Sequence, residues 1–420
     1  MSEPHPPMRA GPDLSARPSV EKAIEFPCPA DGPSEVGLAL SGGGLRATLF
    51  HLGGLIRLRE LGWLGRIDRI SSVSGGSIMA AILARGWKSL QDADFSSVAF
   101  TELVTQPTLR FAGRHIDAFV IAGGLIPGVN PADLLARWFD KDLTGGMRLA
   151  DLPDRPRFIF NAAHLATGVS WRFSKPYMGD SRLGVICEPE LPLARAVAAS
   201  AAFPPFVAPL LVDLRGRVLR QTEGADLFDA PRYRDLRDRV LLLDGGAYDN
   251  LGIEPVEGRC RIVLASDAGG NLGVDARRTP YRFWWPLLRR TLDMAVEAGR
   301  AQRRRALIDR ATAARNLPAG DPVRQRLRTE HVALWRTSLD IRGHRLLPDG
   351  WVVAEGWNDY LSTRPTRLWP MPQTDRERLV TWGYLTADLM LRSWVPDLAG
   401  TPAPATLPFP AVDLSVPPRG

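Results

Sequence analysis

The pattern of apolar and polar positions predicts buried strands that alternate with helices. Residues 36–41 form a short apolar run, three glycines follow at 42–44, and apolar residues then recur at helical spacing through Leu55. This order predicts a strand, a glycine turn and the start of a helix. The backbone N–H groups at a helix start are unpaired and lie at the positive end of the helix dipole. They can therefore hold an anion, either a phosphate or a developing oxyanion.

A second strand-to-helix turn is centred on Ser74. An apolar approach over residues 67–73 precedes it, and the apolar run 78–83 follows it. A nucleophile elbow places its serine on such a turn and needs very small residues two positions before and two positions after it. Ser72 and Gly76 occupy these two positions. The first is usually glycine, so Ser72 is a departure from the pattern, although a small one in volume.

A serine nucleophile needs a general base. Ser72 and Ser77 are rivals to Ser74 as the nucleophile, but neither has a glycine two positions later. The hydrophobic strand predicted over residues 239–243 ends in Asp244, and two glycines follow. Its carboxylate would therefore lie at the carboxyl end of a strand, where sites of α/β proteins form. We expect Asp244 to be the base and the pair to act as a Ser–Asp dyad.

The six histidines do not suggest a triad. Only His51 and His164 lie near predicted strand ends, and His51 is expected to point away along its helix in a structural role. No cluster of His, Cys, Asp and Glu has the spacing of metal ligands, so we expect neither a metal nor a cofactor.

A dinucleotide-binding turn is an alternative interpretation of residues 42–47, with Asp68 as the acid that would bind a ribose. In that interpretation Asp68 would precede the second strand instead of following it, and Ser74 and Asp244 would have no role. A P-loop is excluded because no Gly-Lys-Ser/Thr follows the glycines.

The chain resembles the patatin-like phospholipase family in four blocks, which occur in this order: the glycine-arginine loop at 42–46, the serine turn at Ser74, the segment 199–206, and the Asp-Gly-Gly run at 244–246. Ser41 and Ala47, which flank the loop, are closer to the related cytosolic phospholipases. The resemblance implies a three-layer α/β/α fold with a central, mostly parallel sheet and helical insertions. It also implies esterase or phospholipase A activity without a metal.

The resemblance assigns roles to single residues. It makes Ser74 the nucleophile and Asp244 the base, and it forms the oxyanion hole from the glycine loop, with Gly42, Gly43 and Gly44. The apolar residues of 199–206 would line the acyl pocket. Arg46 directly follows the glycines, where its charge is unfavourable to the helix dipole, so we expect it to bind a phosphate head group or a substrate carboxylate.

Composition is that of a large folded protein. A chain of 420 residues, of which 45% are hydrophobic, can bury the core of one decorated α/β domain. No apolar stretch of about 18 residues predicts a membrane span, and the N-terminus lacks the apolar core of a signal peptide. The three widely spaced cysteines do not suggest disulfides, so we expect a cytoplasmic protein, peripheral to the membrane.

Proline-rich ends at 1–34 and 397–420 predict flexible tails. Between them we expect a catalytic domain over 35–270 and a helical extension over 271–396 packed on it. An N-cap at Asn130 predicts a helix that roofs the site. Three further strands are expected, at 157–163, 169–173 and 261–267.

Positive charge is concentrated in one segment. Residues 277–310 contain ten arginines and three acidic residues, against a net charge of +7 for the whole chain. This argues against a nucleic-acid partner and for a basic patch beside Phe283, Trp284 and Trp285, suited to contact with an anionic membrane. The aliphatic face of the following helix, with Leu288 and Leu292, is expected to pack in the core.

The function predicted from these features is that of a serine lipid acyl hydrolase acting on a phospholipid or another lipid ester. Two alternatives remain. One is a small-molecule esterase or thioesterase, and the other is a non-catalytic lipid-binding module with the same fold.

Overall fold

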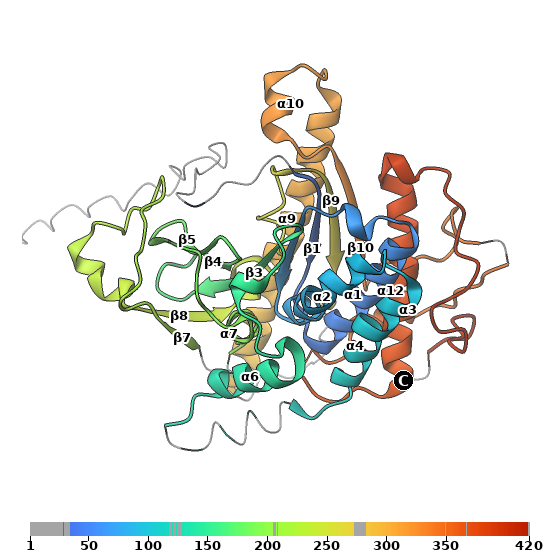
Figure 1. Ribbon diagram of the computed structural model, residues 1–420. Helices are drawn as coiled ribbons and strands as arrows, with labels where there is room; N and C mark the ends of the chain where they lie inside the picture. Colours follow the sequence, from blue (N-terminus) through green and yellow to red (C-terminus); the bar gives the residue numbers. More distant parts are fainter. Residues whose placement is uncertain are drawn as a thin grey trace, which may run out of the picture.

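The computed structural model describes Cys28 and residues 34–116, 120, 123, 126, 128–204, 207, 209–272, 283–348, 350–366 and 368–418 (Figure 1). Its strands are β1 (Ser34–Leu40), β2 (Arg69–Val73), β3 (Arg157–His164), β4 (Ser170–Phe173), β5 (Tyr177–Asp180), β6 (Gly184–Cys187), β7 (Leu210–Asp213), β8 (Arg239–Asp244), β9 (Cys260–Asp267) and β10 (His331–Arg336).

The helices are α1 (Gly44–Glu60), α2 (Gly75–Asp92), α3 (Ser97–Phe100), α4 (Gln106–Phe111), α6 (Pro131–Phe139), α7 (Leu193–Ser200), α8 (Gly246–Asp249), α9 (Trp284–Asn316), α10 (Pro322–Leu327), α11 (Trp357–Ser362) and α12 (Gln373–Trp394). Short 3-10 or π turns lie at Leu64–Arg66, Thr101–Thr105, Asp140–Thr144, Leu149–Asp151, Pro231–Arg237 and Pro396–Leu398.

A ten-stranded mixed sheet forms the centre, in the order β10-β9-β1-β2-β3-β4-β5-β6, with β8 pairing both β3 and β7. The five strands from β10 to β3 are parallel to one another. Parallel strands are covered on both faces, and Figure 1 shows α2 in front of the sheet and α9 running behind it. The predicted three-layer α/β/α fold is confirmed, and an antiparallel half continues the sheet beyond β3.

The predicted strands and the predicted insertion helix are present. The strands expected at 157–163 and 169–173 are β3 and β4, an antiparallel pair, and the strand expected at 261–267 is β9. Asn130 caps α6, because its side-chain oxygen accepts a hydrogen bond from the Ala132 N–H at 2.7 Å.

Two glycines let α1 and α12 cross with their backbones in contact. A Cβ added to Gly53 would lie 2.0 Å from the Val380 carbonyl oxygen, and one added to Gly383 would lie 2.0 Å from the Phe50 carbonyl oxygen. Neither position has room for a side chain, so this crossing fixes the C-terminal helix on the helix that follows the glycine loop.

The C-terminal part of the chain differs from the predicted helical extension and loose tail. It contributes β10, which pairs in parallel with β9 and so belongs to the central sheet. Residues 397–418 are packed on the domain: Leu398 and Leu414 are buried, and the Trp357 indole N–H donates to the Leu414 carbonyl at 3.0 Å. The predicted N-terminal tail lies outside the described residues, apart from Cys28 and Ser34.

The prediction from the cysteines is wrong. Cys28 and Cys187 form a disulfide across a sequence separation of 159 residues, and buried Cys260 is the free thiol. Reading sequence spacing alone cannot detect a pair that the fold brings together. The bond removes one of the arguments for a cytoplasmic location. Among the described helices, none is long and apolar enough to cross a membrane.

The α1–α12 crossing predicts that Gly383→Ala destabilises the fold. The added methyl group would overlap a main-chain carbonyl, which cannot move aside cheaply, so we expect a loss of about 3 kcal/mol in the free energy of unfolding. Chemical denaturation measures it. Gly299→Ala in α9 is the matched control, because a Cβ there meets nothing within 4 Å and alanine favours a helix. Equal stability of both variants would show that the two backbones are not in contact.

Candidate active site

The turn at Ser74 has the strained geometry of a nucleophile elbow. Ser74 has φ 51° and ψ −119°, lies between β2 and α2, and is partly exposed. A Cβ on Gly75 would lie 2.1 Å from the Gly44 carbonyl oxygen, and one on Gly76 would lie 2.3 Å from the Leu40 carbonyl oxygen. The predicted need for a glycine two residues after the serine is explained, because the elbow backbone touches the glycine loop and the end of β1.

The rival serines are occupied in the core. Ser72 and Ser77 are fully buried, and Ser77 Oγ hydrogen-bonds both Ser72 Oγ at 3.0 Å and Ser200 Oγ at 2.8 Å. Ser200 also accepts from the Ser74 N–H at 3.0 Å and donates to the Asn161 carbonyl at 2.6 Å. These three hydroxyl groups support the elbow from below, and Ser74 alone of the four serines reaches the surface.

Ser74 and Asp244 come together because two strands share one edge of β3. β4 pairs with a stretch of β3 whose residues also pair with β2 or with β8. Because β4 occupies one edge of β3 along this stretch, both β2 and β8 lie on the opposite edge. The β2 pairing ends at Val73↔Asn161, and the β8 pairing begins at Asp244↔Ala162, the next position along β3. The carboxyl ends of β2 and β8 therefore meet.

The Asp244 carboxyl is buried beside the elbow. Its Oδ1 accepts a hydrogen bond from the Gly246 N–H at 2.7 Å, and its own backbone N–H donates to the Ala202 carbonyl at 3.0 Å. Burial raises the pKa of Asp244 to about 6, and hydrogen bonding to the Ser74 side chain and to the Gly246 N–H limits the rise. At neutral pH the group is an ionised carboxylate with enhanced basicity.

The glycine loop offers two free donors instead of three. The Gly42 N–H donates to the Asn250 carbonyl at 2.9 Å, so this amide is committed to holding the loop. Gly43 and Gly44 have φ of 145° and 57°, which favour glycine. Within the described part of the chain, neither of their N–H groups donates a hydrogen bond. Gly42 thus differs from its predicted role as an oxyanion donor, whereas the amides of Gly43 and Gly44 remain available.

His51 has the structural role that the sequence predicts. Its Nε2–H donates to the Ser41 carbonyl at 2.9 Å, and its Nδ1 accepts from the Ser266 hydroxyl at 2.7 Å. Burial lowers the pKa of His51 to about 4, against the raising effects of the Ser41 carbonyl and the Asp267 charge, so the ring stays neutral. Both of its nitrogens are used.

His164 also has a partner away from the elbow. Its Nδ1 lies 2.6 Å from Asp180 Oδ2, and its ring is fully buried against Trp171. The carboxylate fixes the orientation of this imidazole on β3. Neither histidine near a strand end is hydrogen-bonded to Ser74 or Asp244.

Arg46 lies in the interior and does not face an anion. Its guanidinium donates to three carbonyl oxygens, those of Ala268 at 3.1 Å, Ser362 at 2.9 Å and Arg364 at 2.7 Å. Burial lowers its pKa to about 10, with Arg300 adding to the decrease and Asp267 opposing it, so the group remains charged. This corrects the predicted anion-binding role: the charge is satisfied by main-chain oxygens that close around the glycine loop.

Sequence reasoning missed several residues of the site. Ser200 lies inside the recognised 199–206 segment, where it is a polar exception among alanines. Asn250 ends the run that begins at Asp244, and its side-chain oxygen would lie 2.3 Å from a Cβ on Gly42. Gly75, the first residue of α2, has an N–H at a helix start and adds a third candidate donor next to the serine.

The structure describes only part of the segment 199–206, whose apolar residues are predicted to line the acyl pocket. The alanines at 201 and 202 are buried, while Phe203 is 36% exposed. Phe206 lies outside the described residues. Two cavities of about 390 and 450 Å³ lie elsewhere, against the α2–α4 pair and at the amino ends of the parallel strands. Among the residues that the structure describes, no group of three or more His, Cys, Asp or Glu is placed to hold a metal ion.

Known proteins were compared with this chain at the levels of structure and sequence. A structure of human GIVD cytosolic phospholipase A2 aligns with a TM-score of 0.46 and 13% identity, covering 86% of this chain and 61% of that one. The same human enzyme in complex with methyl gamma-linolenyl fluorophosphonate and terbium chloride gives 0.44 and 16%, covering 87% and 59%. VipD from Legionella pneumophila gives 0.33 and 15%, covering 87% and 67%.

This chain therefore spans about three fifths of the human enzyme with which it aligns. No curated protein sequence matches it. The model of the patatin-like phospholipase family matches residues 38–256, which is more than half of the chain and contains the glycine loop, the elbow and Asp244. The chain belongs to the patatin-like phospholipase family.

Proposed function

We propose that the protein is a serine hydrolase of lipid carboxylic esters. The observation that carries this proposal is the meeting of three groups: a serine on a strained elbow, a buried carboxylate beside it, and two N–H groups of the glycine loop that donate no hydrogen bond within the described part of the chain. These are the nucleophile, base and oxyanion stabiliser that acyl transfer requires. Family membership supports a lipid ester as the substrate.

In the proposed mechanism, Ser74 Oγ attacks the ester carbonyl while Asp244 accepts its proton. The N–H groups of Gly43 and Gly44 stabilise the oxyanion of the tetrahedral intermediate. Asp244 then gives the proton to the leaving alcohol, and an acyl-enzyme remains on Ser74. Water, deprotonated by the same carboxylate, attacks the acyl group; Asp244 then returns the proton to Ser74 Oγ as the acid is released. Every step uses a side chain or a backbone amide of this chain.

The structure changes which residues of the 277–310 segment we propose for contact with the membrane. Arg303 and Arg304 do not form a free basic face: Arg303 lies 3.7 Å from Asp249, and Arg304 Nη1 lies 2.9 Å from Asp267 Oδ2. Arg310 donates to Glu257 at 3.0 Å. These three arginines are therefore paired with acids of the catalytic domain, whereas those at 277, 278 and 282 lie outside the described residues.

Exposed apolar side chains gather at the start of α9. Phe283 and Trp284 are 71% and 73% exposed, and Leu287 and Leu288 are each about half exposed. The prediction that Leu288 and Leu292 pack in the core is wrong, since Leu292 is also exposed. Large exposed apolar patches mark contact surfaces. We propose that this surface inserts at the interface of the membrane that supplies the substrate; it consists of Phe283, Trp284, Leu287, Leu288, Leu292 and Met294.

Hydrolysis of a panel of defined lipid esters tests the proposed function. Ser74→Ala and Asp244→Asn should each lower turnover by about 10³-fold or more, because nucleophile and base act as one unit. Product release is measured by mass spectrometry. His164→Gln is the control and should keep at least a third of the parent activity, since His164 contacts Asp180 and not the elbow. Turnover that persists in Ser74→Ala would reject the mechanism, and binding of lipids without turnover by the parent would favour the non-catalytic alternative.

The raised pKa of Asp244 predicts the acid limb of the pH profile. The base works only when ionised, so kcat/KM for a soluble short-chain ester should rise with pH through about 6, the pKa that burial gives this carboxyl. Below that pH the rate should fall about tenfold per pH unit. Circular dichroism across the same range separates loss of activity from loss of fold. A rate that stays constant from pH 5 to pH 8 would contradict a buried carboxylate base.

Vesicle cosedimentation tests the α9 surface. With vesicles of phosphatidylcholine and phosphatidylglycerol, the double variant Trp284→Ser/Leu288→Ser should bind at least about tenfold more weakly, because each inserted apolar side chain contributes about 1.5–3 kcal/mol. The control Trp394→Ser/Val98→Ser removes two exposed apolar side chains elsewhere and should bind like the parent. Binding should depend only weakly on salt. A steep salt dependence with no effect of the α9 double variant would restore the basic-patch interpretation.

A further inference from the structure

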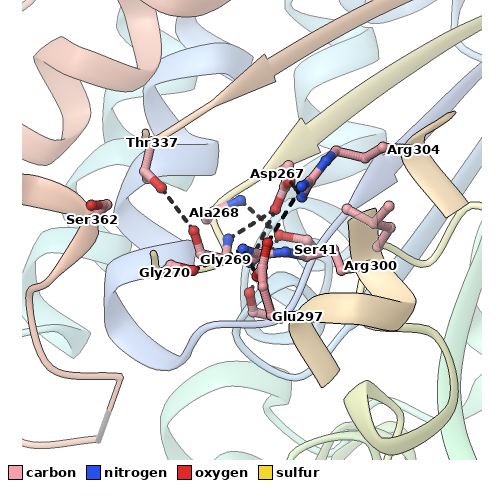
Figure 2. A network of polar contacts seen from close by, with 12 residues as sticks. Ser41, Asp267, Ala268, Gly269, Gly270, Glu297, Arg300, Arg304, Thr337 and Ser362 are labelled. Atoms are coloured by element: carbon pink, nitrogen blue, oxygen red, sulfur yellow. Dashed lines mark hydrogen bonds and ion pairs between the residues drawn. The ribbon is translucent and has the colours of Figure 1, made fainter. Parts of the chain in front are cut away.

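The last residue of β9 and the three that follow it, residues 267–270, form a turn that lies beside Ser41, the residue before the glycine loop (Figure 2). The Ala268 N–H donates to Ser41 Oγ at 2.8 Å, and the Ala268 carbonyl accepts from Arg46 Nε at 3.1 Å. A Cβ built on Gly43 would lie 3.0 Å from the same carbonyl oxygen. Ala268 thus contacts the loop before, within and after its glycines, so the position of the loop follows that of the turn.

The Asp267 side chain holds this turn in place from both of its oxygens. Its Oδ1 accepts from the Gly269 N–H at 3.0 Å, and its Oδ2 accepts from Arg304 Nη1 at 2.9 Å. Arg300 reaches the turn twice: its Nη1 lies 3.5 Å from Asp267 Oδ1, and its Nη2 donates to the Gly270 carbonyl at 2.8 Å. Both arginines come from α9, so the helix is pinned to the turn.

These charges are buried, and they are balanced within the cluster. The side chains of Asp267 and Arg300 are 2% and 5% exposed, and Glu297 pairs with both Arg300 and Arg304. A buried ion pair tolerates few geometries, because removing one partner leaves a charge without compensation. The cluster therefore fixes the distance between α9 and the turn more tightly than an apolar contact would.

We propose that Asp267 and Arg300 are positioning residues for the oxyanion hole. Acting through Ala268, they set the direction in which the Gly43 and Gly44 N–H groups point, and α9 thereby completes a site whose nucleophile and base lie elsewhere. Both residues lie beyond the segment 38–256 that matches the family model. The inference rests on the proposed function, in which these N–H groups stabilise the oxyanion. Because a misplacement of about 1 Å can cost about a hundredfold in rate, such positioning controls kcat.

Two variants test the proposal on a soluble short-chain ester, which needs no membrane. Asp267→Asn keeps a side-chain oxygen for the Gly269 N–H but loses the charge that pairs with α9, and Arg300→Gln removes the pair from the other side. We expect each to lower kcat by about tenfold or more with KM within about threefold, because the loss falls on the transition state. The rate of fluorophosphonate labelling of Ser74 should fall by a similar factor.

Arg310→Gln is the matched control. It also removes an ion pair between α9 and the catalytic domain, with Glu257 at 3.0 Å, but it does not contact the turn or the loop. Its kcat should stay within about twofold of the parent value, because its partner lies away from the oxyanion donors. Thermal unfolding and circular dichroism are recorded for every variant. If Asp267→Asn does not fold, Arg304→Gln replaces it, since this more exposed arginine contacts the other oxygen of the same carboxylate.

The outcomes separate this inference from the proposed function. A parent enzyme without Ser74-dependent turnover overturns both. Suppose that the parent is active, and that the folded Arg300→Gln variant and the folded Asp267→Asn variant (or Arg304→Gln) both keep kcat within about twofold of the parent value. This result overturns the positioning role alone. If kcat falls in the Asp267 and Arg300 variants only as much as in Arg310→Gln, the positioning role is also overturned, because the decrease would then come from weaker anchoring of α9 in general. Partial recovery in Arg300→Lys, which keeps the charge but not the two-armed contact, supports it.

Discussion

The site depends on backbone contact between two turns that have no side chains to separate them. The elbow after β2 presses Gly75 and Gly76 against the carbonyls of Gly44 and Leu40, at distances that leave no room for a Cβ. This contact places Ser74 beside the start of α1, next to the amides of the glycine loop. A residue larger than glycine at position 75 or 76 would move Ser74 away from these amides, so the close approach of the two backbones requires glycine at both positions.

The topology of the sheet brings the Asp244 carboxylate to the elbow. β8 runs antiparallel to β3 and takes over the edge of β3 at the residue after β2 ends. Asp244 therefore reaches the elbow from the opposite direction along the sheet. The carboxylate is then enclosed by the end of α7 and the residues just after it, because the carbonyls of Ser200 and Ala202 accept hydrogen bonds from the Asp-Gly backbone. The same enclosure excludes water, and it is the cause of the raised pKa of Asp244.

Sequence alone predicted the elements that carry local signals. Strand, glycine turn and helix periodicity located β1, β2, β8 and β9, and the Asn-Pro start located α6. What sequence could not predict are interactions between distant segments. The disulfide joins residues 28 and 187, Arg46 binds carbonyls more than 220 residues away, and the Gly42 amide is taken by Asn250. A motif defines which residue type occupies a position, but not which partner the fold brings to it.

The arginines of α9 illustrate the same limit for charge. A count along the chain gives a strongly basic segment, yet in space Arg300 and Arg304 lie on Asp267, and Arg303 lies near Asp249. Charges that neutralise one another across an interface do not attract a membrane; they hold the interface together. The helix then divides by function along its length. Its first turns expose aromatic and aliphatic side chains, and the turns from Arg300 onward bind the strand ends beside the glycine loop.

The C-terminal part of the chain also supports the glycine loop and the turn beside it. Thr337, after β10, donates to the Gly269 carbonyl at 3.0 Å (Figure 2). The end of α11 supplies the Ser362 carbonyl to Arg46. Helix α9, the loop after β10 and the end of α11 thus converge on one four-residue turn and on the arginine behind the glycines. A segment that sequence analysis treats as an appended extension is instead the support against which the glycine loop is held. The folded unit around the candidate site is therefore larger than the segment that carries its motifs.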